Sequence, residues 1–65
     1  MCLSTVYKLE KRPENVVLQN VMLIECKDGR VTLTDIMGRE EVVEGEIASA
    51  DLTGGTVVLR PRQIA

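Results

Sequence analysis

Apolar residues along this chain fall into short runs, separated by polar segments that contain glycine or proline. Valine, isoleucine and leucine supply 20 of the 65 residues, and such branched side chains favour strands. Short strands at regular spacing, with turn signals between them, are typical of a small barrel or sandwich. The pattern predicts an all-β fold: a small antiparallel barrel of the SH3 or Sm kind. About six strands are expected, over residues 3–9, 16–26, 30–36, 39–44, 47–51 and 56–60.

The second run, "VVLQNVMLIEC" over 16–26, is long for one strand. Gln19 and Asn20 interrupt it, so we expect a bend or bulge there and the better strand after it. A helix over 16–22 is the alternative, which the valines and the asparagine disfavour.

A tight hairpin is expected at "KDGR", because Asp-Gly between alternating apolar runs is a strong hairpin signal. Gly29 accepts the positive φ that a type I′ turn requires. In the strand that follows, the alternation places Val31, Leu33 and Asp35 on one side.

The length of the chain allows one domain, covering residues 1–65. A domain this short buries only about 60% of the surface that its unfolded chain exposes, so it is marginal alone. Small scaffolds offset this with disulfides, a metal or association with another subunit. Two cysteines are too few for a disulfide framework.

Composition argues against several classes of function. The net charge is −2, without a block of like charges, and there is one tyrosine but no phenylalanine or tryptophan, so nucleic acid is a poor candidate partner. Histidine is absent and the acidic residues are scattered, so we expect no enzyme. No apolar run is long enough to span a membrane and no signal peptide is visible, which predicts a cytoplasmic protein.

Cys2, directly behind the initiator methionine, is the candidate for chemistry. Met1 is generally removed when the second residue is small, and the chain would then begin with an α-amine and a thiol on adjacent carbons. These two groups close a five-membered chelate ring around a metal ion, and both have pKa values near 8, close enough to neutral for a divalent metal to displace their protons.

One such chain start gives two ligands, and two of them meeting at the axis of a dimer give two nitrogens and two sulfurs. This set in a plane suits Ni(II), and Cu(II) shares the preference, whereas Zn(II) favours a tetrahedron. Two other interpretations of Cys2 stay open, an incidental small residue and an S-acylation site. If Met1 is retained, only the amide nitrogen of Cys2 could replace the amine.

The remaining sulfur atoms and the acidic segment have structural interpretations. Cys26 is the last residue of an apolar strand and has no cysteine or histidine at the spacing of a metal site, so we expect it to be packed in the interior. A disulfide between Cys26 and Cys2 is disfavoured in a reducing cytosol. Met22 and Met37 are expected to fill the core. The acidic "REEVVEGE" over 39–46 lacks calcium-loop spacing and is interpreted as a solvated strand face.

Three stretches, "MCLSTVY", "DGRVTLTDIMGREEVVEGEI" and "ADLTGGTVVLRPR", resemble the CooT family of small nickel-binding proteins over nearly the whole chain. The "MC" start combined with this length and ending is the most specific feature. The resemblance implies a small β-barrel homodimer associated with nickel supply to carbon monoxide dehydrogenase maturation. It also implies that Cys2 of each subunit is the metal ligand at the dimer interface. Cys26 is outside the family pattern, and no role is carried onto it.

The resulting interpretation is a cytoplasmic homodimer that binds one Ni(II) through two Cys2 residues. It would act as a metallochaperone or nickel store without catalytic turnover, with the carbon monoxide dehydrogenase machinery as its client. The rival interpretation is a small barrel that binds a protein or RNA partner without metal. Some relatives carry an RNA-binding label, which the charge balance does not support.

Overall fold

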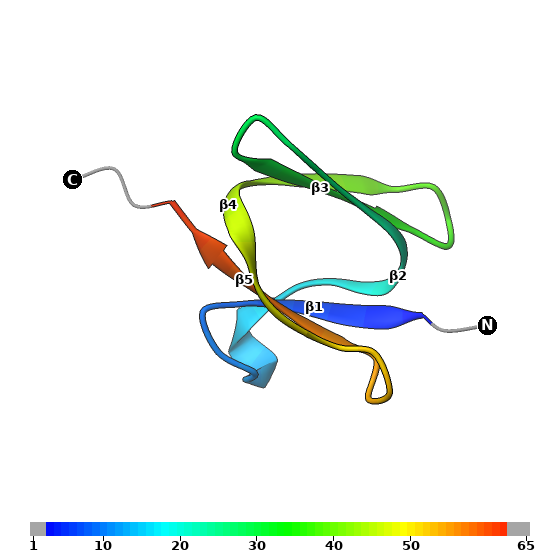
Figure 1. Ribbon diagram of the computed structural model, residues 1–65. Coiled ribbons are helices and arrows are strands. Elements are labelled where there is room, and N and C mark those ends of the chain that lie inside the picture. The colour runs from blue at the N-terminus through cyan, green and yellow to red at the C-terminus, as the bar shows by residue number, and fades with distance from the viewer. Residues whose placement is uncertain (1–2, 63–65) are drawn as a thin grey trace.

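The computed structural model describes residues 3–62 as one closed ring of five strands, with a single short 3₁₀ turn (Figure 1). The strands follow the ring in chain order, and all neighbours are antiparallel except β1 and β5, which run parallel. The small all-β barrel expected from the sequence is therefore confirmed. The elements are β1 (Ser4–Lys8), η1 (Pro13–Asn15), β2 (Val16–Lys27), β3 (Arg30–Asp35), β4 (Glu40–Asp51) and β5 (Thr56–Pro61).

Two strands, β2 and β4, are twice as long as β3 and β5 because each pairs with one neighbour along its first half and with the other along its second half. β2 pairs with β1 up to Val21 and from there with β3. The bend predicted near Gln19 and Asn20 is confirmed: Asn20 has φ +58° and the register shifts just beyond Val21. Such an irregularity turns a strand without ending it.

β4 corrects one prediction, because the separate strands expected over 39–44 and 47–51 form one continuous strand. Its first half pairs with β3 and its second half with β5. Gly45 lies at the change of partner with φ +153°, a conformation open to glycine and strained for other residues. Gly45 therefore lets the strand bend while the hydrogen bonding continues.

Six aliphatic side chains form the core, and β1, β2, β3 and β5 each supply one or two of them. Alternation puts Val31, Leu33 and Asp35 on the interior side of β3, as predicted. The hairpin before β3 has positive φ at Asp28 and Gly29, as a type I′ turn requires. The core residues are Val6, Val21, Val31, Leu33, Val57 and Leu59.

Three sulfur-containing residues predicted to be buried are exposed, so those predictions are wrong. Met22 is 57% exposed because it follows Val21 at the register shift, which reverses the alternation of faces. Met37 is 77% exposed because it lies in the turn after β3. Cys26 is a free, exposed thiol near the tip of the β2–β3 hairpin, beyond the part of β2 that β1 covers.

The two ends of the barrel carry different loops (Figure 1). The start of β1, the β3–β4 turn and the β4–β5 turn gather at one end, which we call the N-terminal end. The β2–β3 hairpin and the last described residues gather at the opposite end.

Candidate functional site

Cys2, the predicted metal ligand, lies outside the described residues, as does Met1. The residues that follow it are fixed in the barrel wall. Ser4 pairs with Val21 of β2, and the backbone N–H of Thr5 donates to the carbonyl oxygen of Gly55 at 2.9 Å. The chain therefore enters β1 between the bend of β2 and the β4–β5 turn.

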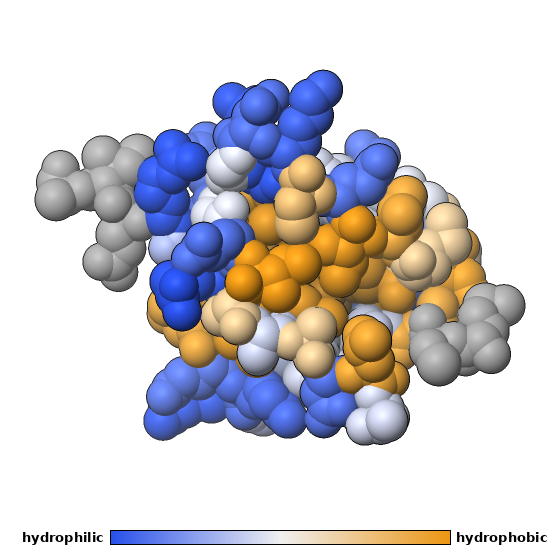
Figure 2. Space-filling model, viewed as in Figure 1, coloured by the Kyte–Doolittle hydropathy of each residue, from blue (hydrophilic) through white to orange (hydrophobic). Residues whose placement is uncertain are grey.

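Four exposed apolar residues, which we call the apolar surface, come from elements that meet at this end: Met22 from β2, Ile36 and Met37 from the β3–β4 turn, and Leu52 from the β4–β5 turn. Their exposed fractions are 57%, 51%, 77% and 78%. Figure 2 shows hydrophobic side chains gathered on one face and extending toward the N-terminal end. Large contiguous apolar patches are uncommon on monomeric soluble proteins and mark interaction sites.

The β3–β4 turn, which carries Ile36 and Met37, is built around the Asp35 carboxylate. Asp35 is 1% exposed and accepts hydrogen bonds from the backbone N–H groups of Met37 (2.9 Å) and Arg39 (2.8 Å) and from Arg39 Nε (2.8 Å). Burial raises the pKa of Asp35, but the hydrogen bonds from Arg39 and Met37 together outweigh it, and the pKa is lowered. The backbone N–H of Ile36 also donates to the Asn20 carbonyl at 2.9 Å, which ties the turn to the bend in β2.

The β4–β5 turn, which carries Leu52, is built around Asp51 in a similar way. Its carboxylate accepts hydrogen bonds from the backbone N–H of Gly54 and from Oγ1 of Thr53, each at 2.9 Å. The hydrogen bond from the backbone of Gly54, with that from Thr53, lowers the pKa of Asp51. Two ionised aspartates thus hold the loops that present the apolar surface.

This surface was not predicted from the sequence, although the sequence contains one signal for it. Ile36, Met37 and Leu52 occupy turn segments, where polar residues are usual, so apolar side chains there lack a structural reason. The predicted solvated face of the acidic segment is confirmed by the exposure of Glu40, Glu41 and the acidic residues that follow. Only Val43 of that segment packs against the core.

Within residues 3–62, no three histidine, cysteine, aspartate or glutamate side chains group as metal ligands. The same part of the chain contains no helix long and apolar enough to cross a membrane.

A family model and a solved structure that resemble this chain agree with each other. The family model described as CO dehydrogenase accessory protein CooT matches residues 1–60. The crystal structure of a candidate CooT from Carboxydothermus hydrogenoformans superposes with a TM-score of 0.82 at 18% identity, covering 95% of this chain and 100% of that one. At this identity the structural likeness shows the fold alone. No protein with a curated description matches the chain.

Proposed function

Because this chain belongs to the CooT family of CO dehydrogenase accessory proteins, we propose that it binds nickel for the maturation of that enzyme. One Ni(II) is held by a homodimer through Cys2 of each subunit. The protein acts as a metallochaperone or a nickel store in the cytoplasm and catalyses no reaction. The observation that carries the proposal is the apolar surface at the end of the barrel where the chain begins.

The position of β1 supports a shared site at the chain start. Cys2 directly precedes Leu3 in the chain, and Ser4 and Thr5 are fixed by pairing with Val21 and by the hydrogen bond to Gly55. A second copy seated on the neighbouring apolar surface brings its own chain start to the same region. A two-fold contact is self-complementary, so each subunit offers the same residues to the other.

The energetics also favour association through this surface. A 65-residue barrel with six buried aliphatic side chains has a small core. Burying exposed apolar surface contributes roughly 25 cal/mol per Å². Met37 and Leu52, more than three-quarters exposed, gain most from being covered.

The ligand chemistry follows from the chain start. Two α-amines and two thiolates, one pair from each subunit, give a planar set of two nitrogens and two sulfurs that suits Ni(II). Binding requires both groups to lose a proton, so nickel affinity rises with pH toward the thiol pKa of about 8.5. A site at a chain terminus, away from the packed core, also suits an ion that has to be released to a client enzyme.

The test is a nickel titration followed by thiolate-to-nickel absorbance, with two matched variants. Cys2→Ser is expected to lose the absorbance band and the binding, whereas Cys26→Ser, which removes the exposed thiol near the β2–β3 hairpin, is expected to bind as the unaltered protein does. Circular dichroism checks that both variants keep the fold. Nickel binding that survives Cys2→Ser and disappears in Cys26→Ser would overturn the assignment.

The apolar surface would equally suit a protein partner in the absence of metal. This rival predicts a monomer that takes up no nickel at any pH near neutral. Size-exclusion chromatography with light scattering, run on the same sample with and without nickel, distinguishes the two proposals.

A further inference from the structure

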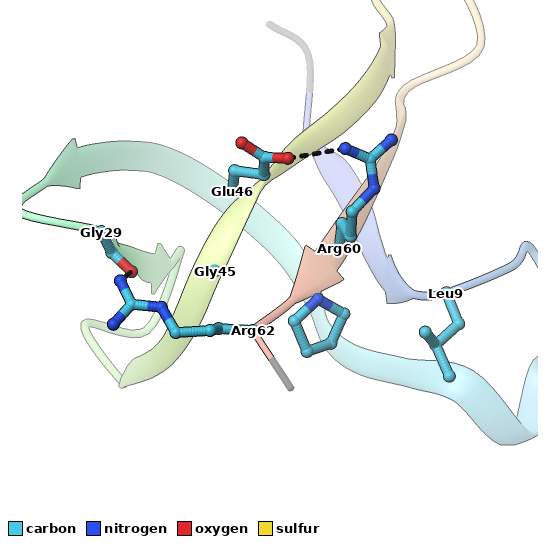
Figure 3. A pocket seen from close by; sticks show the side chains of 7 residues that line it. Leu9, Gly29, Gly45, Glu46, Arg60 and Arg62 are labelled. Carbon is cyan, nitrogen blue, oxygen red and sulfur yellow. Dashed lines mark hydrogen bonds and ion pairs between the residues drawn. The ribbon is translucent and has the colours of Figure 1, made fainter. Parts of the chain in front are cut away.

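A hollow lies at the end of the barrel opposite the N-terminal end. It encloses about 580 Å³, within the usual range for small-molecule sites, between the β2–β3 hairpin, the middle of β4 and the end of β5. Figure 3 shows Arg60 and Arg62 leaving β5 on different sides, with Arg60 directed to Glu46 and Arg62 to Gly29. The proposed nickel site uses none of these residues.

The two arginines differ in how their charges are satisfied. Arg60 Nη1 lies 2.6 Å from Glu46 Oε2, a formed ion pair. Arg62 Nη2 reaches only the carbonyl oxygen of Gly29, at 3.5 Å, and that oxygen already accepts the backbone N–H of Gly45 at 2.8 Å. Among residues 3–62, no carboxylate lies within ion-pairing distance of Arg62.

The charge around the hollow is opposite to that of the whole chain. An adjoining hollow shares Gly29, Gly45 and Glu46 with the first, so the two form one region. Four cations and two carboxylates line this region, whereas the chain has a net charge of −2. The cations are Lys27, Arg30, Arg60 and Arg62, and the carboxylates are Asp28 and Glu46.

An apolar side chain in an unusual backbone conformation lines the same hollow. Leu9 has φ +72° and is 59% exposed. A leucine in the left-handed region is strained, and asparagine or glycine is the common residue there. Such strain at an exposed apolar residue suggests a role other than stability. Pro61 adds a second apolar group beside the arginines.

From these features we propose that the hollow binds a small carboxylate with an apolar body. The Arg62 guanidinium pairs with the carboxylate, because its planar fork matches the two oxygens. Leu9 and Pro61 contact the apolar part. In the first hollow, Arg60 is paired with Glu46, which leaves the Arg62 guanidinium to bind the anion, while Lys27 and Arg30 line the adjoining hollow. The carboxylate can come from a free aliphatic acid or from the C-terminus of a peptide that ends in an apolar residue.

The test is a ¹H–¹⁵N NMR titration of the full chain with hexanoate, with hexanamide as its uncharged counterpart. Saturable shifts are expected at the amides of Leu9, Gly29, Gly45 and Arg62 with hexanoate, and binding at least about tenfold weaker is expected with hexanamide. A Gly-Gly-Leu peptide, as free acid and as C-terminal amide, forms the second arm. The stronger of the two acids identifies the source of the carboxylate.

Three variants complete the test. Arg62→Gln is expected to weaken hexanoate binding about tenfold or more, whereas Arg12→Gln, which removes the same charge from a residue outside the hollow, leaves it unchanged. Leu9→Asn introduces a residue that accepts positive φ and removes the apolar contact. The variant is therefore expected to melt no lower than the unaltered protein and to bind hexanoate more weakly. Equal binding of hexanoate and hexanamide, no saturable shifts with either acid, or unchanged binding in Arg62→Gln would overturn the proposal.

Discussion

Replacing Gly45 by alanine tests the bend that makes β4 one strand. Gly45 has φ +153°, and a Cβ there would overlap the Arg60 carbonyl oxygen and lie 2.8 Å from Pro61 Cα and 3.0 Å from Arg62 N. These are backbone atoms of the paired strand, which cannot rotate away as the end of a side chain can. The strands must separate to make room.

The expected destabilisation is the sum of broken hydrogen bonds and backbone strain. Separating β4 from β5 breaks the hydrogen bond from Arg62 N–H to Glu44 O (2.7 Å), and the displacement of Gly45 disrupts the bond from its N–H to Gly29 O (2.8 Å) on the opposite side, each contributing about 1 kcal/mol. Backbone strain adds about 1–3 kcal/mol. The total, roughly 3–5 kcal/mol, is comparable with the whole stability of a domain of this size, about 3–10 kcal/mol at the usual value per residue.

Gly38→Ala is the matched control. Gly38 also has positive φ, +87°, but nothing lies within 4 Å of an added Cβ, so only the conformational strain of about 1–2 kcal/mol applies. In thermal unfolding followed by circular dichroism, a domain of this size loses roughly 4–8 °C per kcal/mol. Gly45→Ala is expected to melt at least about 10 °C below Gly38→Ala. Equal melting temperatures would contradict the claim that the β5 backbone leaves no room for a Cβ at position 45.

Three further predictions concern the turns, the apolar surface and the core. The pKa values of Asp35 and Asp51 are lowered in the folded state, so the two ionised carboxylates stabilise the fold fully above the ordinary aspartate pKa of about 3.9. This stabilisation declines as the pH falls through the lowered values. The melting temperature of Asp35→Asn should therefore be lower than that of the unaltered protein near neutral pH and should depend less on pH in acid. Met37→Asp and Leu52→Asp should each leave the melting curve of a dilute sample almost unchanged and convert the proposed dimer to a monomer in light scattering. Leu33→Ala, at a fully buried position, should lower the free energy of unfolding by about 2–5 kcal/mol in urea titration, and a loss below about 1 kcal/mol would contradict the packing described.

The sequence predicted those parts of the fold that depend on local patterns. The alternation of Val31, Leu33 and Asp35 and the Asp-Gly hairpin are set by neighbouring residues, and both were confirmed. The continuity of β4 through Gly45 depends on the partners β3 and β5, which lie far away in the chain. A glycine that breaks a strand and a glycine that bends one have the same local sequence.

The errors in side-chain burial have a similar origin. Met22 was assigned to the core from the alternation of its own strand, but the register shift beyond Val21 changes which side it faces. Among residues 3–62 the interior holds only six buried aliphatic side chains, so several apolar residues remain on the surface. Their gathering at the N-terminal end could not be read from the sequence, because it requires the two turns to be placed beside the start of β1.

The hollow at the other end depends on the same long-range placement. Arg62 and Gly29 are 33 positions apart, and only the closed barrel brings them together. The sequence offered one local sign, a leucine at the end of the first strand where the chain turns, but its positive φ is visible only in the structure.

Native mass spectrometry of the purified protein with nickel added counts chains and metal ions in one particle, so it tests whether two chains share one nickel ion. We expect a dimer with one nickel ion, chains that lack Met1, and no nickel in Cys2→Ser. One nickel on each monomer, or a dimer of Cys2→Ser that retains the ion, would contradict it.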